Sequence, residues 1–312
     1  MASVASASSS APLRDVSNKL PMSIEDTYQK KTQLEHILLR PDTYVGSIER
    51  TRQECWVFDG GRKFTSRTIE FVPGLYKIFD EILVNAADNK QRDPSMSLID
   101  VEINPDTGRI SVWNDGHGIP IQIHKKEGCY VPELIFGHLL TSSNYNDTQK
   151  KTTGGRNGYG AKLANIFSKE FVVETADGVQ IYKQVFKNNM SVIGKPQIRD
   201  NPKGKEYTKI SFLPDFARFG MDALEADTVS LLAKRVYDMA GVSDRSLRVK
   251  LNGERIKVSS FKDYVQMYLP DEDPLVPSER PVFHNRINNR WEIVVTQSDG
   301  HFEQVSFVNA IR

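Results

Sequence analysis

Cysteine is scarce in this sequence, and long apolar runs are absent from it. The 312 residues include two cysteines, Cys55 and Cys129, which are far apart and form no closely spaced metal-binding pair. We therefore expect two reduced, structural thiols in an intracellular protein rather than a disulfide framework. No apolar stretch approaches the roughly 20 residues that a membrane-spanning helix needs.

An excess of charge of either sign is also missing. The 41 Lys and Arg side chains nearly balance the 40 Asp and Glu side chains, which leaves a formal net charge of +1. A strongly basic global field is thereby excluded, so any DNA contact has to come from a local patch or from a region outside this sequence. The Ala- and Ser-rich start lacks the apolar core of a signal peptide, and we expect residues 1–23 to be a disordered tail.

The composition, 39% hydrophobic and 26% charged, is that of a globular protein. Helical spacing of apolar residues predicts helices, and alternation predicts strands. The helices expected on this basis are 26–39, one that begins at Pro73-Gly74, 132–139, 157–167, 222–239 and 261–269. The expected strands are 55–58, 68–72, 99–103, 109–113, 170–175, 180–186, 208–213, 247–251, 255–258, 291–296 and 302–308.

This order of elements predicts an α+β fold, in which helices are segregated against a mixed or antiparallel sheet. A second unit is expected to start near Ser259. Because the sequence stops directly after an expected strand, we expect residues 259–312 to be a truncated second domain.

A helix face is the first of three segments that suggest chemistry. Glu81, Asn85 and Asp88 are spaced i, i+4, i+7, which places them on one strip beside the apolar stripe, and Asn89 borders that strip. A carboxylate such as that of Glu81 can orient and deprotonate an attacking water. An amide oxygen such as that of Asn85 is a hard ligand that suits Mg²⁺. The alternative interpretation is an ordinary solvated polar face.

Two glycines follow a later strand, in Asn114-Asp115-Gly116-His117-Gly118. They permit a tight turn and a close approach of the backbone to a ligand. The side-chain oxygen of Asn114 or Asp115 can accept a hydrogen bond from the exocyclic amine of adenine. An ordinary glycine-rich turn is the alternative.

The third segment is the richest in glycine. Residues 153–162 read Thr-Gly-Gly-Arg-Asn-Gly-Tyr-Gly-Ala-Lys and lead into an apolar helix. Backbone N–H groups ahead of a helix bind phosphate oxygens, and Lys162 adds a positive charge. The spacing fits neither a P-loop nor a dinucleotide fingerprint. A flexible loop remains the alternative.

Weaker signals lie nearby. The run Thr141-Ser142-Ser143-Asn144 suits contacts to ribose or phosphate, although such clusters are commonly turns. Thr208, on an expected strand, can hold a water that faces adenine. The six histidines show no metal spacing, and we expect them to be structural or surface residues.

Together, the three segments resemble the nucleotide-binding boxes of the gyrase, Hsp90, histidine kinase and MutL (GHKL) superfamily. The similarity is closest to the ATPase region of eukaryotic type II DNA topoisomerases, because residues 29–44 resemble the N-terminal segment of that family. The motif Tyr264-Val265-x-Met267-Tyr268-Leu269 resembles the start of its transducer domain. The resemblance implies a Bergerat (GHKL) ATPase sandwich with its N-terminal arm over residues 24–258, followed by a truncated transducer domain over residues 259–312.

The resemblance also implies a role for each matching position. Glu81 is expected to be the general base, Asn85 the Mg²⁺ ligand and Asn114 the adenine contact. Tyr28, on the N-terminal arm, is a candidate ligand for ATP in the partner subunit. The expected ribose and phosphate contacts are Ser142, Ser143 and Asn144, and the residues expected to wrap the triphosphate are Gly155, Arg156, Asn157, Gly158, Tyr159, Gly160, Ala161 and Lys162.

The implied function is the ATP-driven gate of a nuclear type II DNA topoisomerase, whose homodimeric clamp closes on double-stranded DNA. Bacterial gyrase-type sequences have Asp where this chain has Asn114, so the hydrogen bonds around adenine must differ. The family's Gln-Thr-Lys loop with its switch lysine, and its basic DNA-facing loop, have no counterpart in the sequence. We therefore expect ATP and Mg²⁺ binding, with weak hydrolysis and weak dimerisation.

Three other functions compete with this interpretation. A chaperone or mismatch-repair ATPase of the same superfamily is disfavoured by residues 28–31 and by Lys162. A phosphotransferase of the histidine-kinase type needs a phospho-acceptor helix, and none fits in residues 1–25. A non-catalytic nucleotide-binding module is distinguished by Glu81, which such a module does not need.

Overall fold

The protein is represented by a computed structural model that describes residues 23–139, 141, 158–270, 280–288, 290–298, 300 and 302–311. Its elements, in chain order, are α1 (Ile24–Thr27), α2 (Gln33–Leu39), α3 (Asp42–Val45), β1 (Thr51–Val57), β2 (Thr65–Phe71), α4 (Pro73–Arg92), β3 (Leu98–Asn104), β4 (Arg109–Asn114), α5 (Val131–Gly137), α6 (Gly160–Ile166), β5 (Ser168–Asp177), β6 (Gln180–Lys187), β7 (Val192–Ile193), β8 (Gln197–Asp200), β9 (Glu206–Pro214), η1 (Phe216–Phe219), α7 (Ala226–Val242), β10 (Arg248–Leu251), β11 (Glu254–Arg255), α8 (Phe261–Gln266), β12 (Val282–Asn288) and β13 (Trp291–Thr296).

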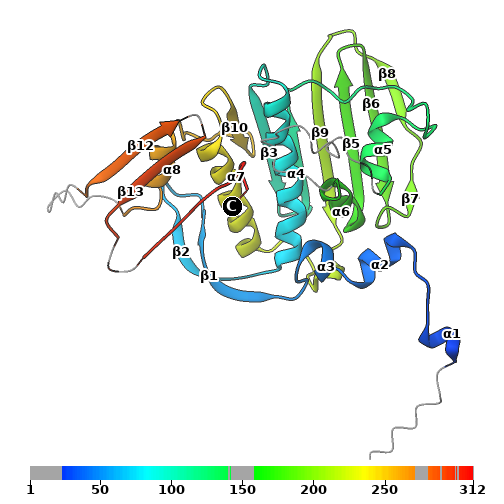
Figure 1. Ribbon diagram of the computed structural model, residues 1–312, viewed down its shortest axis with the longest axis horizontal. Coiled ribbons are helices and arrows are strands. Elements are labelled where there is room, and N and C mark those ends of the chain that lie inside the picture. Colours follow the sequence, from blue (N-terminus) through cyan, green and yellow to red (C-terminus); the bar gives the residue numbers. More distant parts are fainter. Residues whose placement is uncertain are drawn as a thin grey trace, which may run out of the picture.

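A nine-stranded sheet forms one layer, and helices α4 to α7 cover one of its faces (Figure 1). The strand order is β11-β10-β3-β4-β9-β5-β6-β7, and β8 pairs with β6 beside this path. Strand β10 runs parallel to β3, whereas the other pairs in this sheet are antiparallel. The predicted α+β class with a mixed sheet is therefore confirmed.

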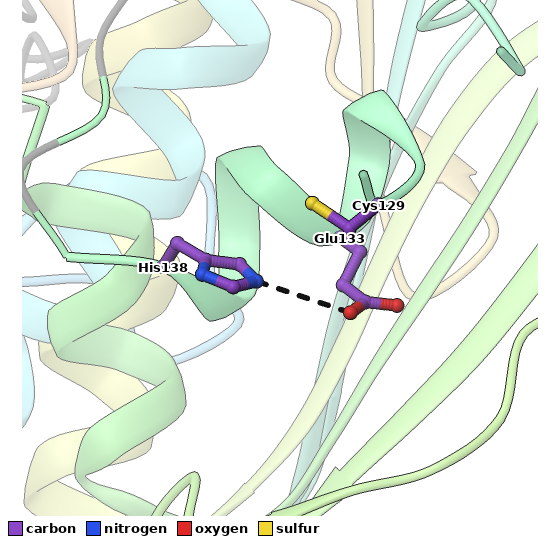
Figure 2. A group of neighbouring side chains, drawn as sticks. All are labelled: Cys129, Glu133 and His138. Carbon is purple, nitrogen blue, oxygen red and sulfur yellow. Dashed lines mark ion pairs between the residues drawn. The ribbon is translucent and has the colours of Figure 1, made fainter. Parts of the chain in front are cut away.

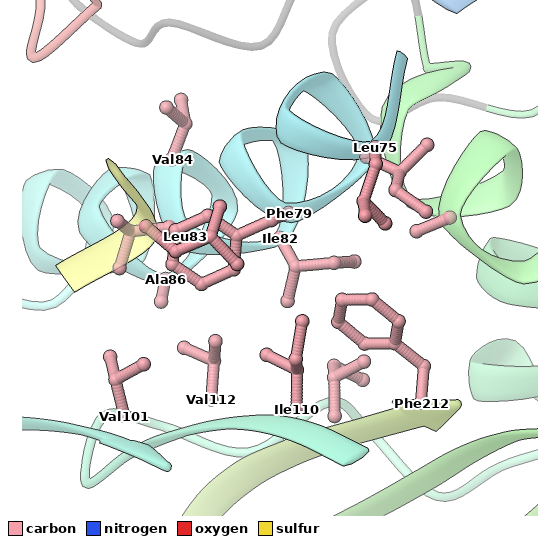
Figure 3. Packing of buried hydrophobic residues seen from close by; sticks show 14 of the residues in the cluster. Leu75, Phe79, Ile82, Leu83, Val84, Ala86, Val101, Ile110, Val112 and Phe212 are labelled. Carbon is pink, nitrogen blue, oxygen red and sulfur yellow. The ribbon is translucent and has the colours of Figure 1, made fainter. Parts of the chain in front are cut away.

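Helix α4 is the central helix on this sheet. Pro73 occupies its first turn, where a missing backbone N–H leaves no bond unmade. Its apolar residues recur with the period of a helix and bury one face against β3, β4 and β9 (Figure 3). The residues in that contact include Leu75, Phe79, Ile82, Leu83 and Ala86 of α4 and Val101, Ile110, Val112 and Phe212 of the sheet.

Helix α7 packs beside α4 and is tied to it by a buried ion pair. The Arg235 side chain is 1% exposed, and its Nε donates to Oδ1 of Asp80 at 2.7 Å. The Nη2 group of Arg235 donates to the carbonyl oxygen of Ala310 at 2.6 Å. One guanidinium group therefore joins α4, α7 and the segment that contains Ala310.

Two smaller sheets lie outside the nine-stranded sheet. The β1–β2 hairpin packs on this helix through a small apolar cluster that includes Val57, Ile69 and Leu231. The β12–β13 hairpin lies beside α8 in Figure 1. Helix α8 meets α7 where the hydroxyl of Tyr264 donates to Asp238 at 2.7 Å. Within the described residues, none of the helices combines the length and the apolar character of a membrane span.

Two sequence predictions need correction. The helix expected over 26–39 is two helices, because Thr32 caps α2: its Oγ1 accepts from the N–H of Glu35, and the Glu35 carboxylate accepts from the N–H of Thr32. The strand expected over 302–308 is wrong, since within the described residues this stretch contributes only an isolated bridge between Val308 and Ile311. The tail expected over 1–23 lies outside the described residues except for Ser23.

Candidate functional site

Glu81 lies where α4 meets the beginning of α6. Its side chain is 21% exposed, and its Oε1 forms an ion pair with Nζ of Lys77 at 2.5 Å. A Cβ atom placed on Gly160 would lie 1.9 Å from Oε2 of Glu81. Because that distance is far below any contact that a real Cβ makes, position 160 requires glycine while Glu81 has this orientation. The first and third segments therefore meet at this pair.

Asn85 lies one helical turn after Glu81 on α4. Its side chain is exposed, although Val84 and Ala86 on either side are buried. Asp88 on the same strip is buried, so the strip is not uniformly solvated, and the role of Asn85 stays a prediction. The strip therefore presents the carboxylate of Glu81 and the amide of Asn85 to one region, as the spacing predicts.

Asn114 ends β4 and is buried at 5% exposure. Its Oδ1 accepts from Nδ2 of Asn89 at 2.9 Å and from the N–H of Gly116 at 3.3 Å. Its Nδ2 donates to the carbonyl oxygen of Thr208 at 3.5 Å. Asn89, which the sequence places only at the border of the polar strip, thus joins α4 to the second segment and orients the Asn114 amide.

Asp115, the other residue that the sequence suggests for an adenine contact, has both carboxylate oxygens bonded at the turn before β3. One carboxylate oxygen accepts from the N–H groups of Ser97 and Leu98 at 2.8 and 2.7 Å. The other accepts from the hydroxyl of Ser97 at 2.6 Å. The side chain is committed to the turn before β3, and Asn114 remains the polar group of this segment that is suited to adenine.

Gly118 lies against β5. A Cβ on this residue would lie 1.8 Å from the carbonyl oxygen of Ala176, so glycine is required for this close approach of two backbones. Next to it, the buried Thr175 accepts from the N–H of Ile119 at 2.9 Å, and its Oγ1 lies 3.1 Å from Oγ1 of Thr208. Thr208 is the cross-strand partner of Asn114, so the two predicted adenine-side residues are neighbours. Thr175 was missed because a threonine in an apolar strand carries no signal of its own.

Lys162 lies in α6 and is 2% exposed. Among the described residues, its Nζ donates to the carbonyl oxygens of Thr141 at 2.8 Å and Gly158 at 2.6 Å. Burial lowers the pKa of Lys162 to about 8. An ammonium group has three donors, and within the described residues two of them go to these carbonyl oxygens. This arrangement suits a phosphate group.

Tyr159 connects the glycine-rich segment to the N-terminal arm, a contact that no local sequence pattern indicates. Its hydroxyl accepts from Nε2 of Gln33 in α2 at 2.8 Å. Tyr28, which follows α1, is 78% exposed, and α1 lies away from the sheet (Figure 1). One chain therefore does not bring Tyr28 to Glu81, and its role in a partner subunit stays a prediction.

Six of the expected nucleotide contacts fall outside the described residues, so their roles stay predictions. They are Ser142, Ser143, Asn144, Gly155, Arg156 and Asn157. The described part of the third segment, residues 158–162, begins at Gly158 with a φ of 68°, in the left-handed region that favours glycine.

A further cluster of possible metal ligands lies around α5, although the cysteines and histidines show no metal spacing in the sequence. Figure 2 shows Cys129, Glu133 and His138 gathered around α5. One potential ligand atom from each residue lies within 4.8 Å of the other two. The signal was present as a Cys and a Glu four residues apart, but the histidine joins them only because α5 ends at Gly137 and the chain turns there.

The chain matches a family described as histidine kinase-, DNA gyrase B- and HSP90-like ATPase, over residues 72–217. DNA topoisomerase 2 of Pisum sativum is 57% identical over 290 residues, which are 92% of this chain and 20% of that protein. DNA topoisomerase 2-alpha of Homo sapiens is 53% identical over 295 residues, which are 94% of this chain and 19% of that protein. The chain thus spans about a fifth of the length of these curated relatives.

Solved structures of ATPase regions also resemble this chain. The ATPase region of Saccharomyces cerevisiae topoisomerase II superposes with a TM-score of 0.86 at 54% identity, covering 92% of this chain and 75% of that chain. The 43K ATPase domain of Thermus thermophilus gyrase B has a TM-score of 0.56 at 21% identity, covering 84% of this chain and 61% of that chain. The second likeness is one of fold.

Proposed function

Because the chain belongs to the eukaryotic type II DNA topoisomerase family through its ATPase region, we propose that it binds and hydrolyses ATP as the gate of such an enzyme. In this role, ATP binding closes a homodimeric clamp in the nucleus, so that one DNA duplex passes through another. The contact between Glu81 and Gly160 supports the proposal most directly. It puts a carboxylate against the backbone that is expected to hold the phosphates.

Glu81 acts as the general base. Its Oε2 faces the beginning of α6, and its ion pair with Lys77 through Oε1 holds the carboxylate in that orientation. A carboxylate placed there accepts a proton from a water molecule that attacks the terminal phosphate. Proton transfer to a positioned base typically contributes about 10²- to 10⁴-fold to a rate.

The triphosphate lies along residues 155–162. Phosphoryl transfer depends mainly on positioning and on neutralising charge, so backbone N–H groups and one buried lysine are the groups that the chemistry needs. Lys162 is held by the carbonyl oxygens of Thr141 and Gly158, which direct its ammonium group without neutralising it.

Asn85 fits the Mg²⁺ that accompanies ATP in this reaction. Its amide is exposed one turn from Glu81, and Mg²⁺ usually takes few protein ligands and keeps waters and phosphate oxygens for the rest. When bound, Mg²⁺ supplies positive charge to the phosphates. Asn114 contacts adenine with Thr208 beside it, and Ser142, Ser143 and Asn144 contact ribose and phosphate.

The division into domains is part of the same proposal. Residues 24–258 form the ATPase domain with its N-terminal arm, and residues 259–312 belong to the transducer domain. The boundary is supported by the end of the large sheet at β11 and the start of α8 at Phe261. Tyr28 on the exposed arm then reaches the nucleotide of the partner subunit in the closed homodimer.

The test is Glu81→Gln, with Glu49→Gln as the matched control because Glu49 is an exposed glutamate outside the site. We expect Glu81→Gln to bind a non-hydrolysable ATP analogue with Mg²⁺ as the parent chain does, by calorimetric titration. Its ATP hydrolysis should fall by at least about 100-fold, whereas the control should hydrolyse at the parental rate. Parental hydrolysis by Glu81→Gln would show that another group is the base. Absence of nucleotide binding by the parent chain would refute the proposal as a whole.

A further inference from the structure

Three side chains with different metal-binding groups lie together around α5, apart from the residues proposed to bind ATP (Figure 2). Cys129 precedes the helix, Glu133 lies in its first turn, and His138 is its C-cap residue. The sulfur, a carboxylate oxygen and an imidazole nitrogen all lie within 4.8 Å of one another. All three residues are partly buried.

The imidazole of His138 has a buried ring nitrogen. Its Nε2 is a buried atom with no hydrogen-bond partner in the described part of the chain. The nearest carboxylate oxygen, Oε1 of Glu133, is 3.9 Å away, which is too long for a hydrogen bond. A buried nitrogen left unpaired is unfavourable, whereas an ion between Nε2 and Oε1 would bind both atoms.

Glu133 is held in place by an outer chain of hydrogen bonds. Its Oε2 accepts from Nε2 of Gln184 at 2.7 Å, and Oε1 of Gln184 accepts from the hydroxyl of Tyr182 at 2.6 Å. Gln184 and Tyr182 are both buried. Outer partners of this kind orient the carboxylate that binds a metal, and here they leave Oε1 directed towards His138.

The three groups select the ion by their chemistry. Thiolate, imidazole and carboxylate together suit Zn²⁺, whereas Mg²⁺ and Ca²⁺ prefer oxygen ligands. Bond lengths of about 2.0–2.3 Å in a tetrahedron separate the ligand atoms by roughly 3.3–3.8 Å. The three ligand atoms lie within 4.8 Å of one another, so small side-chain rotations bring them to these distances.

We propose that Cys129, Glu133 and His138 bind one Zn²⁺ ion, and that a water molecule completes its coordination. When Zn²⁺ binds, the thiol of Cys129 loses its proton to solvent as the zinc–sulfur bond forms, and no electron is transferred.

The experiment is a Co²⁺ titration of the reduced, metal-free chain without nucleotide, followed by addition of Zn²⁺. We expect a thiolate-to-cobalt absorption band that saturates at one Co²⁺ per chain and disappears when Zn²⁺ displaces it. Excess Mg²⁺ should leave the band intact. A parent chain that shows no band, or a band that Mg²⁺ removes, would overturn the proposal. Because no nucleotide is present, the result is independent of the proposed ATPase activity.

Two variants locate the site. Cys129→Ser should abolish the band, and Cys55→Ser is the matched control because it removes the only other cysteine. His138→Gln should weaken Co²⁺ affinity at least tenfold, and its side chain is 43% exposed, so the fold should tolerate the change. Circular dichroism checks that each variant is folded. Equal loss of the band in Cys55→Ser, or parental affinity in His138→Gln, would contradict the assignment.

Discussion

The carboxylate of Glu81 occupies the space that a Cβ on Gly160 would need, with Oε2 lying 1.9 Å from that position. The two residues belong to different helices and to different sequence motifs, and their contact is what joins those motifs into one site. The size of residue 160 therefore controls the direction of the Glu81 carboxylate.

Gly160→Ala should lower ATP hydrolysis by about 10- to 100-fold, because a displacement of about 1 Å at a reacting group has effects of that size. The new methyl group meets the flexible end of Glu81 rather than backbone, so the fold should survive. We expect an unfolding free energy within about 1 kcal/mol of the parent. Gly61→Ala is the matched control, since nothing lies within 4 Å of its Cβ position. Unchanged turnover in Gly160→Ala would mean that the Glu81 orientation does not matter.

Gly118→Ala should lower the free energy of unfolding. Its new Cβ would lie 1.8 Å from the carbonyl oxygen of Ala176, and backbone of β5 has to shift to relieve the contact. Overpacking of this kind typically costs about 1–3 kcal/mol. Urea denaturation should show a lower midpoint than in Gly61→Ala, and equal midpoints for the two variants would contradict the close approach.

Asn89→Ala should weaken nucleotide binding although Asn89 is not itself expected to contact ATP. Its Nδ2 bonds Oδ1 of the buried Asn114 at 2.9 Å and so fixes the amide that is proposed to contact adenine. Loss of one such bond corresponds to about 0.5–1.5 kcal/mol, or roughly a 2- to 13-fold rise in Kd. Calorimetry with an ATP analogue measures the change in Kd, and Asn285→Ala, at an exposed position of β12, is a control. Unaltered or tighter binding would show that Asn114 is oriented by other contacts.

Lys162 should make stability depend on pH in a defined window. Its pKa is lowered to about 8 by burial, whereas a lysine in the unfolded chain keeps its ordinary value near 10.5. Between these values the unfolded chain binds the extra proton, so stability rises with pH through this window, by roughly 3 kcal/mol in total. The penalty of burying the charge is fully present below pH 8.

The measurement is urea unfolding of the parent chain and of Lys162→Met at several pH values between 7 and 10. The stability difference should shift in favour of the parent as the pH rises, because the parent loses a buried charge that the variant never had. Lys183→Met is the control, since Lys183 is exposed and should add no such slope. A difference that is constant with pH would show that the ammonium group is not desolvated in the folded chain.

Local sequence patterns predict the elements of this fold because each depends on neighbours in the chain. The period of apolar residues predicts α4, and alternation predicts β3 and β4, as observed. The same reasoning fails at Thr32, where a helical period continues across a capping box that divides two helices. It also fails over 302–308, because alternation does not supply the hydrogen-bonded partner that a strand needs.

The site is predictable in its residue types but not in its contacts. Glu81 and Asn114 follow from what their groups can do at their spacing. The partners Gly160, Asn89 and Thr175 depend on which helices and strands meet, and no local pattern contains that information. Asp115 is a case in which the residue type misleads. Its place in the motif suits a contact to adenine, but its carboxylate bonds the turn before β3.

Asp80 and Glu81 are successive residues of α4, so their side chains leave the helix axis about 100° apart. Asp80 is joined to the buried Arg235, and breaking one partner of a buried ion pair costs about 3–5 kcal/mol. Rotation of α4 about its own axis would break that pair. Arg235 of α7, which also bonds the carbonyl oxygen of Ala310, therefore opposes rotation of α4 about its axis. The direction of the Glu81 carboxylate therefore depends on an ion pair on the other side of the helix as well as on the apolar face of α4.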